Sequence, residues 1–180
     1  MYTARVPGSK HRAVFTTMRI NSEISEVVAL LMDFENCRKW AKTCKELEVV
    51  SSLSETTQRV YAVVDLPFPA KDRDSISLIR WEKDNRTGIV SMESNADPLA
   101  SEELDSKYIH MTYAHVLWRI VPSPKGLIIE NYAHLNPNGA LPVWLTNLLS
   151  TEEPYKTLRR MRARLNEGHY QNANISWLNN

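Results

Sequence analysis

The feature that most constrains this fold is a series of six β-rich segments, joined by short turns and followed by one long amphipathic segment. Runs rich in β-branched and aromatic residues predict strands, and hairpin-length connections predict antiparallel pairing. A single antiparallel sheet must cover its apolar face, and the C-terminal segment is the available cover. The six predicted strands span residues 45–53, 57–66, 75–83, 88–94, 108–121 and 127–135.

Two segments have the periodicity of helices. A strand predicted over 11–20 leads into a helix over 23–35, where apolar residues recur at helical spacing. A second, longer helix is predicted over 144–165. Pro154 lies inside it and should kink or divide it, because proline lacks a backbone N–H and clashes with the preceding turn.

The composition is that of a soluble, globular chain. Of 180 residues, 43% are hydrophobic and 24% are charged, which excludes collagen-like and largely disordered chains. Lys and Arg total 22 and Asp and Glu total 21, so no overall field attracts nucleic acid. The apolar runs are too short to cross a bilayer. We expect one domain over 1–168 and a polar, frayed tail over 169–180.

Cys37 and Cys44 are too few for a disulfide scaffold, and no histidine lies near them at zinc spacing. The sequence favours two structural thiols. It leaves open a small loop disulfide, which would require an oxidising compartment.

Catalytic motifs are scarce. The sequence has no GxSxG, P-loop, GxGxxG or HExxH motif, and we expect no cofactor and no metal. His110 and His115 lie five residues apart on one predicted strand, so they should point to opposite faces. His134 stands alone, and a lone histidine in a strand is more often a packed or surface residue than a catalyst.

Apolar side chains gather at alternate positions of the predicted strands. Val60, Ala62 and Val64 share one strand face, for example. Periodicity alone favours a solid core beneath the helix. A curved sheet that grips one helix can also enclose an apolar cavity suited to a hydrophobic ligand.

The C-terminal helix carries a basic cluster. The cluster could be a solvated helix face without a binding role, or it could contact an anionic membrane surface. The cluster consists of Lys156, Arg159, Arg160, Arg162 and Arg164.

Three motifs occur in a recognisable order. The segment YAVVDLPFPAKDRDSISLIRWEK (61–83) contains a Pro-rich loop and the pair Arg73-Asp74 at the start of the next strand. It is followed by VLWRIVP (116–122) and by NPNGALPVWLTNLL (136–149). Together they resemble the START family, the steroidogenic-acute-regulatory-related lipid-transfer domains of the Bet v 1-like superfamily. The resemblance covers roughly residues 10–166, and EEPYKTLRRMRARL is similar to the bacterial branch.

The resemblance implies an α+β helix-grip fold, in which a curved antiparallel sheet surrounds a long C-terminal helix and an internal apolar cavity. Family members bind sterols, phospholipids, ceramide or other apolar molecules, and many are carriers or sensors without catalytic activity. The side chains expected to line the cavity are Val60, Ala62, Val64, Ile79, Trp81, Met111, Tyr113, Trp118, Asn131, Leu135, Leu145 and Leu149.

The sequence departs from the sterol-binding members. Those members place an acid and an arginine inside the cavity, and an ungapped count from the Arg-Asp pair puts Val60 and Ile79 at these positions. Arg80 is one position later and should face the other way unless a bulge intervenes. A sterol hydroxyl would therefore lack its partner.

Two other functions remain open. One is an enzyme similar to polyketide aromatase/cyclases, which would need inward polar groups from His115, His134, Tyr113 or Arg80. The other is a protein-interaction module with a filled core.

Trp118→Arg is expected to abolish ligand binding if the cavity exists.

The resemblance also has implications for how a ligand enters the cavity and for the cellular location of the protein. The acidic loop at 95–106 and the C-terminal helix would flank the cavity mouth, with Pro154 as a candidate hinge. The first residues lack the apolar segment of a signal peptide. Bacterial relatives often have one before a segment like YTARVPGS. The expected location is periplasmic if such a peptide has been removed, and cytoplasmic otherwise.

Overall fold

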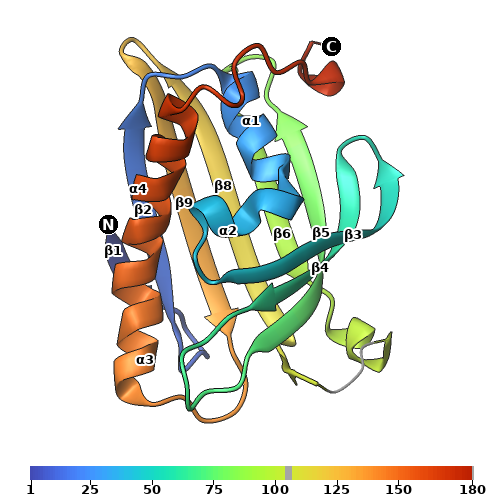
Figure 1. Ribbon diagram of the computed structural model, residues 1–180, viewed down its shortest axis with the longest axis vertical. Helices are drawn as coiled ribbons and strands as arrows, with labels where there is room; N and C mark the ends of the chain where they lie inside the picture. The colour runs from blue at the N-terminus through green and yellow to red at the C-terminus, as the bar shows by residue number, and fades with distance from the viewer. Residues whose placement is uncertain (104–106, 180) are drawn as a thin grey trace.

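A curved, largely antiparallel sheet is wrapped around a long C-terminal helix in the computed structural model, which describes residues 1–103 and 107–179 (Figure 1). The predicted α+β helix-grip architecture is therefore confirmed. The strand order is β1-β2-β9-β8-β6-β5-β4-β3, and the short β7 pairs parallel with the start of β5. The strands are β1 (Tyr2–Arg5), β2 (Arg12–Ile20), β3 (Cys44–Ser54), β4 (Thr57–Val64), β5 (Arg73–Lys83), β6 (Val90–Ala96), β7 (Ile109–His110), β8 (Tyr113–Ser123) and β9 (Gly126–Asn136).

The helices lie on the concave face of the sheet. They are α1 (Ile24–Met32), α2 (Cys37–Trp40), α3 (Val143–Asn147) and α4 (Glu153–Asn166), with the 3₁₀ turns η1 (Phe34–Asn36), η2 (Pro98–Glu103) and η4 (Ser176–Leu178). The predicted helix over 23–35 is thus divided, and α2 crosses in front of the sheet (Figure 1). Among the described residues, no helix is long and apolar enough to span a bilayer.

Strand register places one row of side chains across the concave face. Thr16 is opposite Asn131, Asn131 is opposite Trp118, and Trp118 is opposite Met92, which in turn pairs with Trp81. Directly paired residues share a face and alternate residues point the other way. This row therefore identifies the inward face of five consecutive strands.

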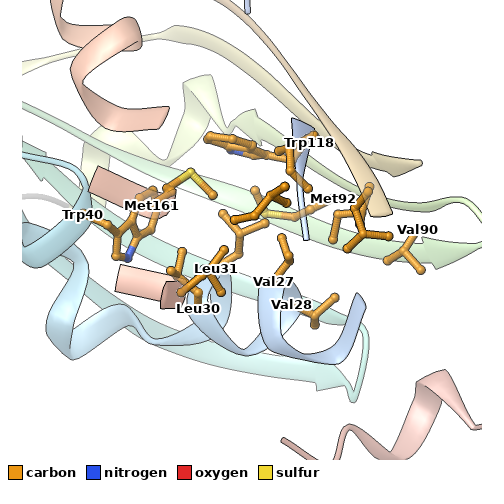
Figure 2. Close-up of a cluster of buried hydrophobic side chains, with 14 of the residues drawn as sticks. Val27, Val28, Leu30, Leu31, Trp40, Val90, Met92, Trp118 and Met161 are labelled. Carbon is orange, nitrogen blue, oxygen red and sulfur yellow. The ribbon is translucent and has the colours of Figure 1, made fainter. Parts of the chain in front are cut away.

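Half of the concave face is filled by a hydrophobic core beneath α1. Figure 2 shows Val27, Leu30 and Leu31 of α1 near Val90, Met92 and Trp118 of the sheet. The helix packs there because its apolar positions recur at helical spacing. Trp40 of α2 and Met161 of α4 lie at the far side of this core (Figure 2).

The C-terminal helix is interrupted before Pro154, as the sequence predicts. A wide π-type turn, Leu148–Glu152 (η3), separates α3 from α4, and Pro154 lies in the first turn of α4. Proline supplies no N–H to Ser150, so the regular hydrogen-bond ladder cannot pass through this point. The interruption falls in the part of the helix that covers the sheet.

The C-terminal residues are packed, although the sequence predicts a frayed tail. The Trp177 ring lies 5.6 Å from the Trp81 ring, and Leu178 accepts a hydrogen bond from the Lys83 ammonium through its backbone oxygen. Tyr170, Ile175 and Leu178 pack against the core as well, and burial of these side chains outweighs the polar composition of the rest of the tail. The tail thus closes the core at the end of the sheet near α1.

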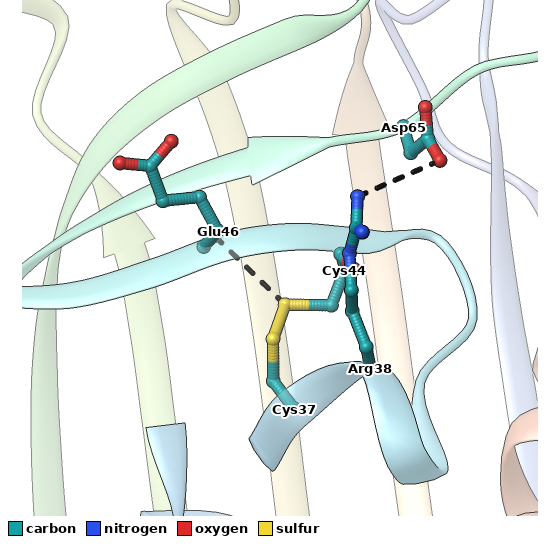
Figure 3. Close-up of a disulfide and its surroundings, with 5 residues drawn as sticks. All are labelled: Cys37, Arg38, Cys44, Glu46 and Asp65. Carbon is teal, nitrogen blue, oxygen red and sulfur yellow. Dashed lines mark hydrogen bonds and ion pairs between the residues drawn. A yellow bond between two sulfur atoms is a disulfide. The ribbon is translucent and has the colours of Figure 1, made fainter. Parts of the chain in front are cut away.

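Cys37 and Cys44 form a disulfide, so the expectation of two free thiols is wrong (Figure 3). Cys37 begins α2 and Cys44 begins β3, and the sharp chain reversal between them brings their Cα atoms to 5.9 Å. Arg38 donates to the Cys44 carbonyl at 3.0 Å and lies 3.9 Å from Asp65 (Figure 3). The bridge therefore fixes α2 against the sheet.

Removing the disulfide should lower stability. Its cysteines are seven residues apart, and the chain-entropy relation gives about 2.5 kcal/mol for a loop of this size. Urea unfolding should show a loss near this value for the double variant Cys37→Ala/Cys44→Ala. The wild type should show a similar loss in dithiothreitol, whereas the double variant should not respond to the reductant. A wild-type protein that is insensitive to reductant would contradict the prediction.

Candidate functional site

An apolar cavity of about 340 Å³ lies between the other half of the concave face and the helical cover. This volume is within the range of sites that take a small organic ligand. The strands contribute Val14, Val64, Val116, Trp118, Asn131 and Ala133, and the cover contributes Thr146, Leu149, Ser150, Glu153, Pro154 and Thr157. A filled-core protein would lack such a space, so the interaction-module hypothesis loses its main support.

Six of the twelve side chains expected at the cavity line it. They come from the three strands β4, β8 and β9, the residue after β7 and the helical cover, and they are Val64, Met111, Trp118, Asn131, Leu135 and Leu149. Strand alternation explains this set, because Trp118, Asn131 and Leu135 all belong to the inward face. Their role in binding remains a prediction.

The other six side chains lie outside the lining. Val60, Ile79 and Trp81 are buried in the core beneath α1. Leu145 is fully buried in α3, and Ala62 is partly buried on β4.

Tyr113 is 45% exposed because it lies an odd number of residues from Trp118 and points to the convex face. Val60 and Ile79 share a sheet face with the cavity, but α1 already fills the space in front of them.

Several lining residues were missed by sequence reasoning. Trp40, Ala41 and Thr43 come from α2 and the segment after it, and His11 and Arg12 come from the start of β2. No local sequence pattern indicates that α2 crosses the concave face of the sheet beside the cavity. Only the chain reversal closed by the disulfide brings this segment to the cavity.

Two tryptophans separate the cavity from the solid core. Trp40 and Trp118 meet edge to face with ring centroids 6.4 Å apart, and each is only 7% exposed. Both also line the cavity. Edge-to-face aromatic contacts are favourable and specific in geometry. The pair therefore forms the inner wall against which a ligand would rest.

Most of the cavity surface is apolar, but polar side chains also line it, including Arg73, Asn131 and Glu153. The Asn131 amide donates to the Leu117 carbonyl at 3.4 Å. Glu153 Oε1 accepts from Lys156 at 3.2 Å, while its buried Oε2 has no hydrogen-bond partner among the described residues. A ligand held here would be retained mainly by apolar burial, worth roughly 25 cal/mol per Å².

The side chains of Arg73 and Asp74 point to opposite faces of β5 and hold different segments of the chain. Buried Arg73 donates through Nε to the Pro137 carbonyl at 2.9 Å, through Nη2 to the Asn138 carbonyl at 3.1 Å, and through Nη1 to the Lys71 carbonyl. Burial lowers the pKa of this guanidinium. Arg73 thus fastens the loop that leads into α3, the start of the cavity cover.

Asp74 points to the opposite face of β5. Tyr61 donates to its carboxylate at 3.2 Å, and the other oxygen contacts His110 Nδ1 on β7. Burial and the Asp74 charge raise the pKa of the Tyr61 phenol. Asp74 therefore fastens β7 to the sheet, and the two neighbours make no ion pair with each other because they face opposite ways.

The polar groups considered for a cyclase lie outside the cavity. His134 Nδ1 is 3.3 Å from the Tyr113 hydroxyl, but both belong to the convex face. His115 pairs with Glu93 at 2.9 Å on that same face. Arg80 is exposed, and β5 runs in regular register at this point without a bulge. The described residues also contain no group that could hold a metal ion.

The five cations of the basic cluster have different surroundings. Lys156 pairs with Glu152 at 2.9 Å, and Arg162 donates to the Arg19 carbonyl at 2.9 Å. Arg164 pairs with Glu167 at 2.6 Å. Arg159 is exposed and Arg160 is half-buried. The surroundings of the five cations therefore differ, and their contact with a membrane stays a prediction.

The acidic loop expected at 95–106 is described only as far as residue 103, and residues 104–106 lie outside the described residues. Within the described part, η2 contacts β5. The described cover of the cavity is formed by α3, η3 and the start of α4.

Fold and cavity together define a helix-grip domain with a role in hydrophobic ligand binding. The chain belongs to the START domain family, whose model matches residues 4–169. A bacterial member of known structure, a STAR-related lipid transfer protein from Xanthomonas axonopodis, is 27% identical and superimposes with a TM-score of 0.81 over 92% of each chain.

The chain is also similar to three other proteins. An uncharacterised protein of Pseudomonas aeruginosa is 26% identical over 164 residues, which is 91% of this chain and 80% of the relative. Human STARD10 is 19% identical, with a TM-score of 0.75 over 94% of this chain and 71% of its own. The di-domain aromatase/cyclase StfQ of the steffimycin pathway is 12% identical, with a TM-score of 0.59 over 87% of this chain and 51% of its own, and shows only the shared fold.

Proposed function

We propose that this protein binds one hydrophobic, lipid-like molecule in its cavity and carries it without chemical change. The observation that supports this function is the largely apolar cavity between the sheet and the helical cover. The likeness to a STAR-related lipid transfer protein supports carriage. The histidines considered for a cyclase, His115 and His134, lie on the convex face and give no support to a catalytic role in this cavity.

The proposed ligand is more apolar than a sterol bound through its hydroxyl. The positions where sterol-binding relatives have an acid and an arginine hold Val60 and Ile79, and both are buried in the core. Burying an unpaired hydroxyl costs free energy that apolar contacts must offset. An acyl chain or another hydrocarbon group would need no such hydroxyl partner, so it fits the cavity better than a sterol does.

Ligand exchange would require the cover to open. Trp144 of α3 is 50% exposed and Tyr155 of α4 is 57% exposed, so the cover presents aromatic side chains outward. Such amphipathic rings are favoured at a membrane–water interface. We propose that α3 touches a membrane transiently while the cover opens at the π-type turn.

The disulfide supports a location outside the cytoplasm. Disulfides form and persist in oxidising compartments such as the bacterial periplasm. The Cys37–Cys44 bridge therefore favours the periplasmic alternative over the cytoplasmic one.

A transfer assay tests this function. The protein should accelerate movement of a fluorescent acyl-chain lipid from donor to acceptor vesicles in proportion to its concentration. Trp144→Ser should slow this transfer several-fold and leave equilibrium binding of the lipid unchanged, since Trp144 lies outside the cavity lining. Tight binding without acceleration would contradict carriage, and chemical conversion of a cavity ligand would favour an enzyme.

A further inference from the structure

A second pocket lies between α2 and α4 and is lined by cationic side chains. Its lining consists of Lys39 from α2, Arg160, Ala163 and Arg164 from α4, and Glu167 after α4. The two helices are in contact (Figure 1), so the pocket is built by residues more than a hundred positions apart in the sequence. It lies outside the cavity lining, and carriage of an apolar ligand gives it no role.

The cations of this pocket lack sufficient counter-charge. Arg160 Nη1 and Arg164 Nε are buried atoms without a hydrogen-bond partner among the described residues. Lys39 and Arg160 also make no ion pair with a described acid. Glu167 supplies the one negative charge of the lining and is 2.6 Å from Arg164. Three cations against one carboxylate leave the lining with a formal charge of +2.

Nearby charges do not remove this excess. The Arg164 guanidinium also lies 5.9 Å from the Tyr170 ring, whose hydroxyl donates to Asp33 at 2.7 Å. Asp33 is thus engaged with Tyr170. Leaving buried donors unpaired is costly, and the excess positive charge of the lining favours an anion in the pocket.

Helix geometry explains why this pair of arginines acts together. Arg160 and Arg164 are four residues apart on α4 and share one helix face. Thr157 precedes them on that face and lines the apolar cavity. Arg159 is adjacent in sequence but is exposed and outside the pocket.

We infer that Lys39, Arg160 and Arg164 form a binding site for a phosphate group. Planar guanidinium groups bind phosphate oxygens through paired, charge-assisted hydrogen bonds, and an ammonium adds a compact positive charge. The phosphate could belong to a lipid headgroup at a membrane surface or to a soluble phosphate. This inference does not depend on the content of the apolar cavity.

The test compares Arg160→Gln with Arg159→Gln, which removes the same charge one position away. Two probes are used at about 0.15 M salt, where long-range attraction is screened: inorganic phosphate followed by calorimetry, and phosphatidylglycerol vesicles followed by co-sedimentation. Arg160→Gln should weaken binding of at least one probe by about tenfold or more. Arg159→Gln should change it less than about twofold. Binding of a fluorescent fatty acid in the cavity serves as the folding control and should stay unchanged.

Comparison of the two probes identifies the source of the phosphate group. An Arg160-dependent loss confined to vesicles assigns a lipid headgroup, and an Arg160-dependent loss with inorganic phosphate assigns a soluble ligand. Glu167→Gln should have the opposite sign and strengthen binding several-fold, because it removes the like charge and releases Arg164. Equal effects of the Arg159 and Arg160 substitutions, or no binding of either probe by the wild type, would overturn the inference.

Discussion

Replacing Ala133 by tryptophan is expected to abolish binding of an apolar ligand while the protein stays folded. Ala133 lies on β9, opposite Val116 of β8, and both side chains line the cavity. An indole at this position would project into the cavity of about 340 Å³ and would occupy the space of the ligand. Titration with a fluorescent fatty acid should show no saturable binding.

The matched control is Ala4→Trp on β1. Ala4 is exposed at the edge of the sheet, so the same substitution there leaves the cavity unchanged. Ala133→Trp is also a cleaner test than Trp118→Arg, because Trp118 packs against Trp40 and belongs to the core. A charged side chain at position 118 would disturb the contact with Trp40 and the hydrophobic core as well as the cavity. Unchanged affinity in a folded Ala133→Trp protein would contradict ligand binding in this cavity.

Replacing Arg73 by methionine should lower the free energy of unfolding by about 2–4 kcal/mol. The buried guanidinium donates to the carbonyls of Lys71, Pro137 and Asn138, and methionine would leave these acceptors without their donor. The loop before α3 would then lose its attachment to the sheet. Urea unfolding measures the loss, and hydrogen exchange should rise in the segment 137–147.

Arg80→Met is the control for this substitution. Arg80 lies on the same strand but is exposed, so its replacement should change stability by less than about 0.5 kcal/mol. Equal stability of the two variants would show that Arg73 does not hold the loop. If Arg73→Met lowers the stability but leaves hydrogen exchange at 137–147 unchanged, the substitution acts on a part of the protein other than this loop.

The order of the elements and the inward strand face could be read from the sequence. Alternation of apolar residues is local, so it correctly put Val60, Ala62 and Val64 on one face of their strand. The same alternation puts Val60 and Ile79 on the inward face, but it does not show that α1 fills the space before them. Which half of the face stays open depends on contacts between distant segments.

Three features had no local signal. Cys37 and Cys44 are close because the chain reverses after α2, and seven residues of sequence alone leave that reversal undetermined. Trp177 packs on Trp81 although most of the C-terminal tail is polar. Arg160 and Lys39 meet only because α2 contacts α4. Each depends on tertiary packing, which periodicity and propensity do not encode.

Native mass spectrometry of the purified protein, followed by organic extraction and lipid mass spectrometry, tests the central claim most directly. We predict one apolar molecule per chain in the wild type, either co-purified or acquired from mixed lipids. We predict none in Ala133→Trp. An apo mass that stays unchanged after incubation with lipids, or equal occupancy in both proteins, would contradict the assignment of this cavity as a hydrophobic ligand site.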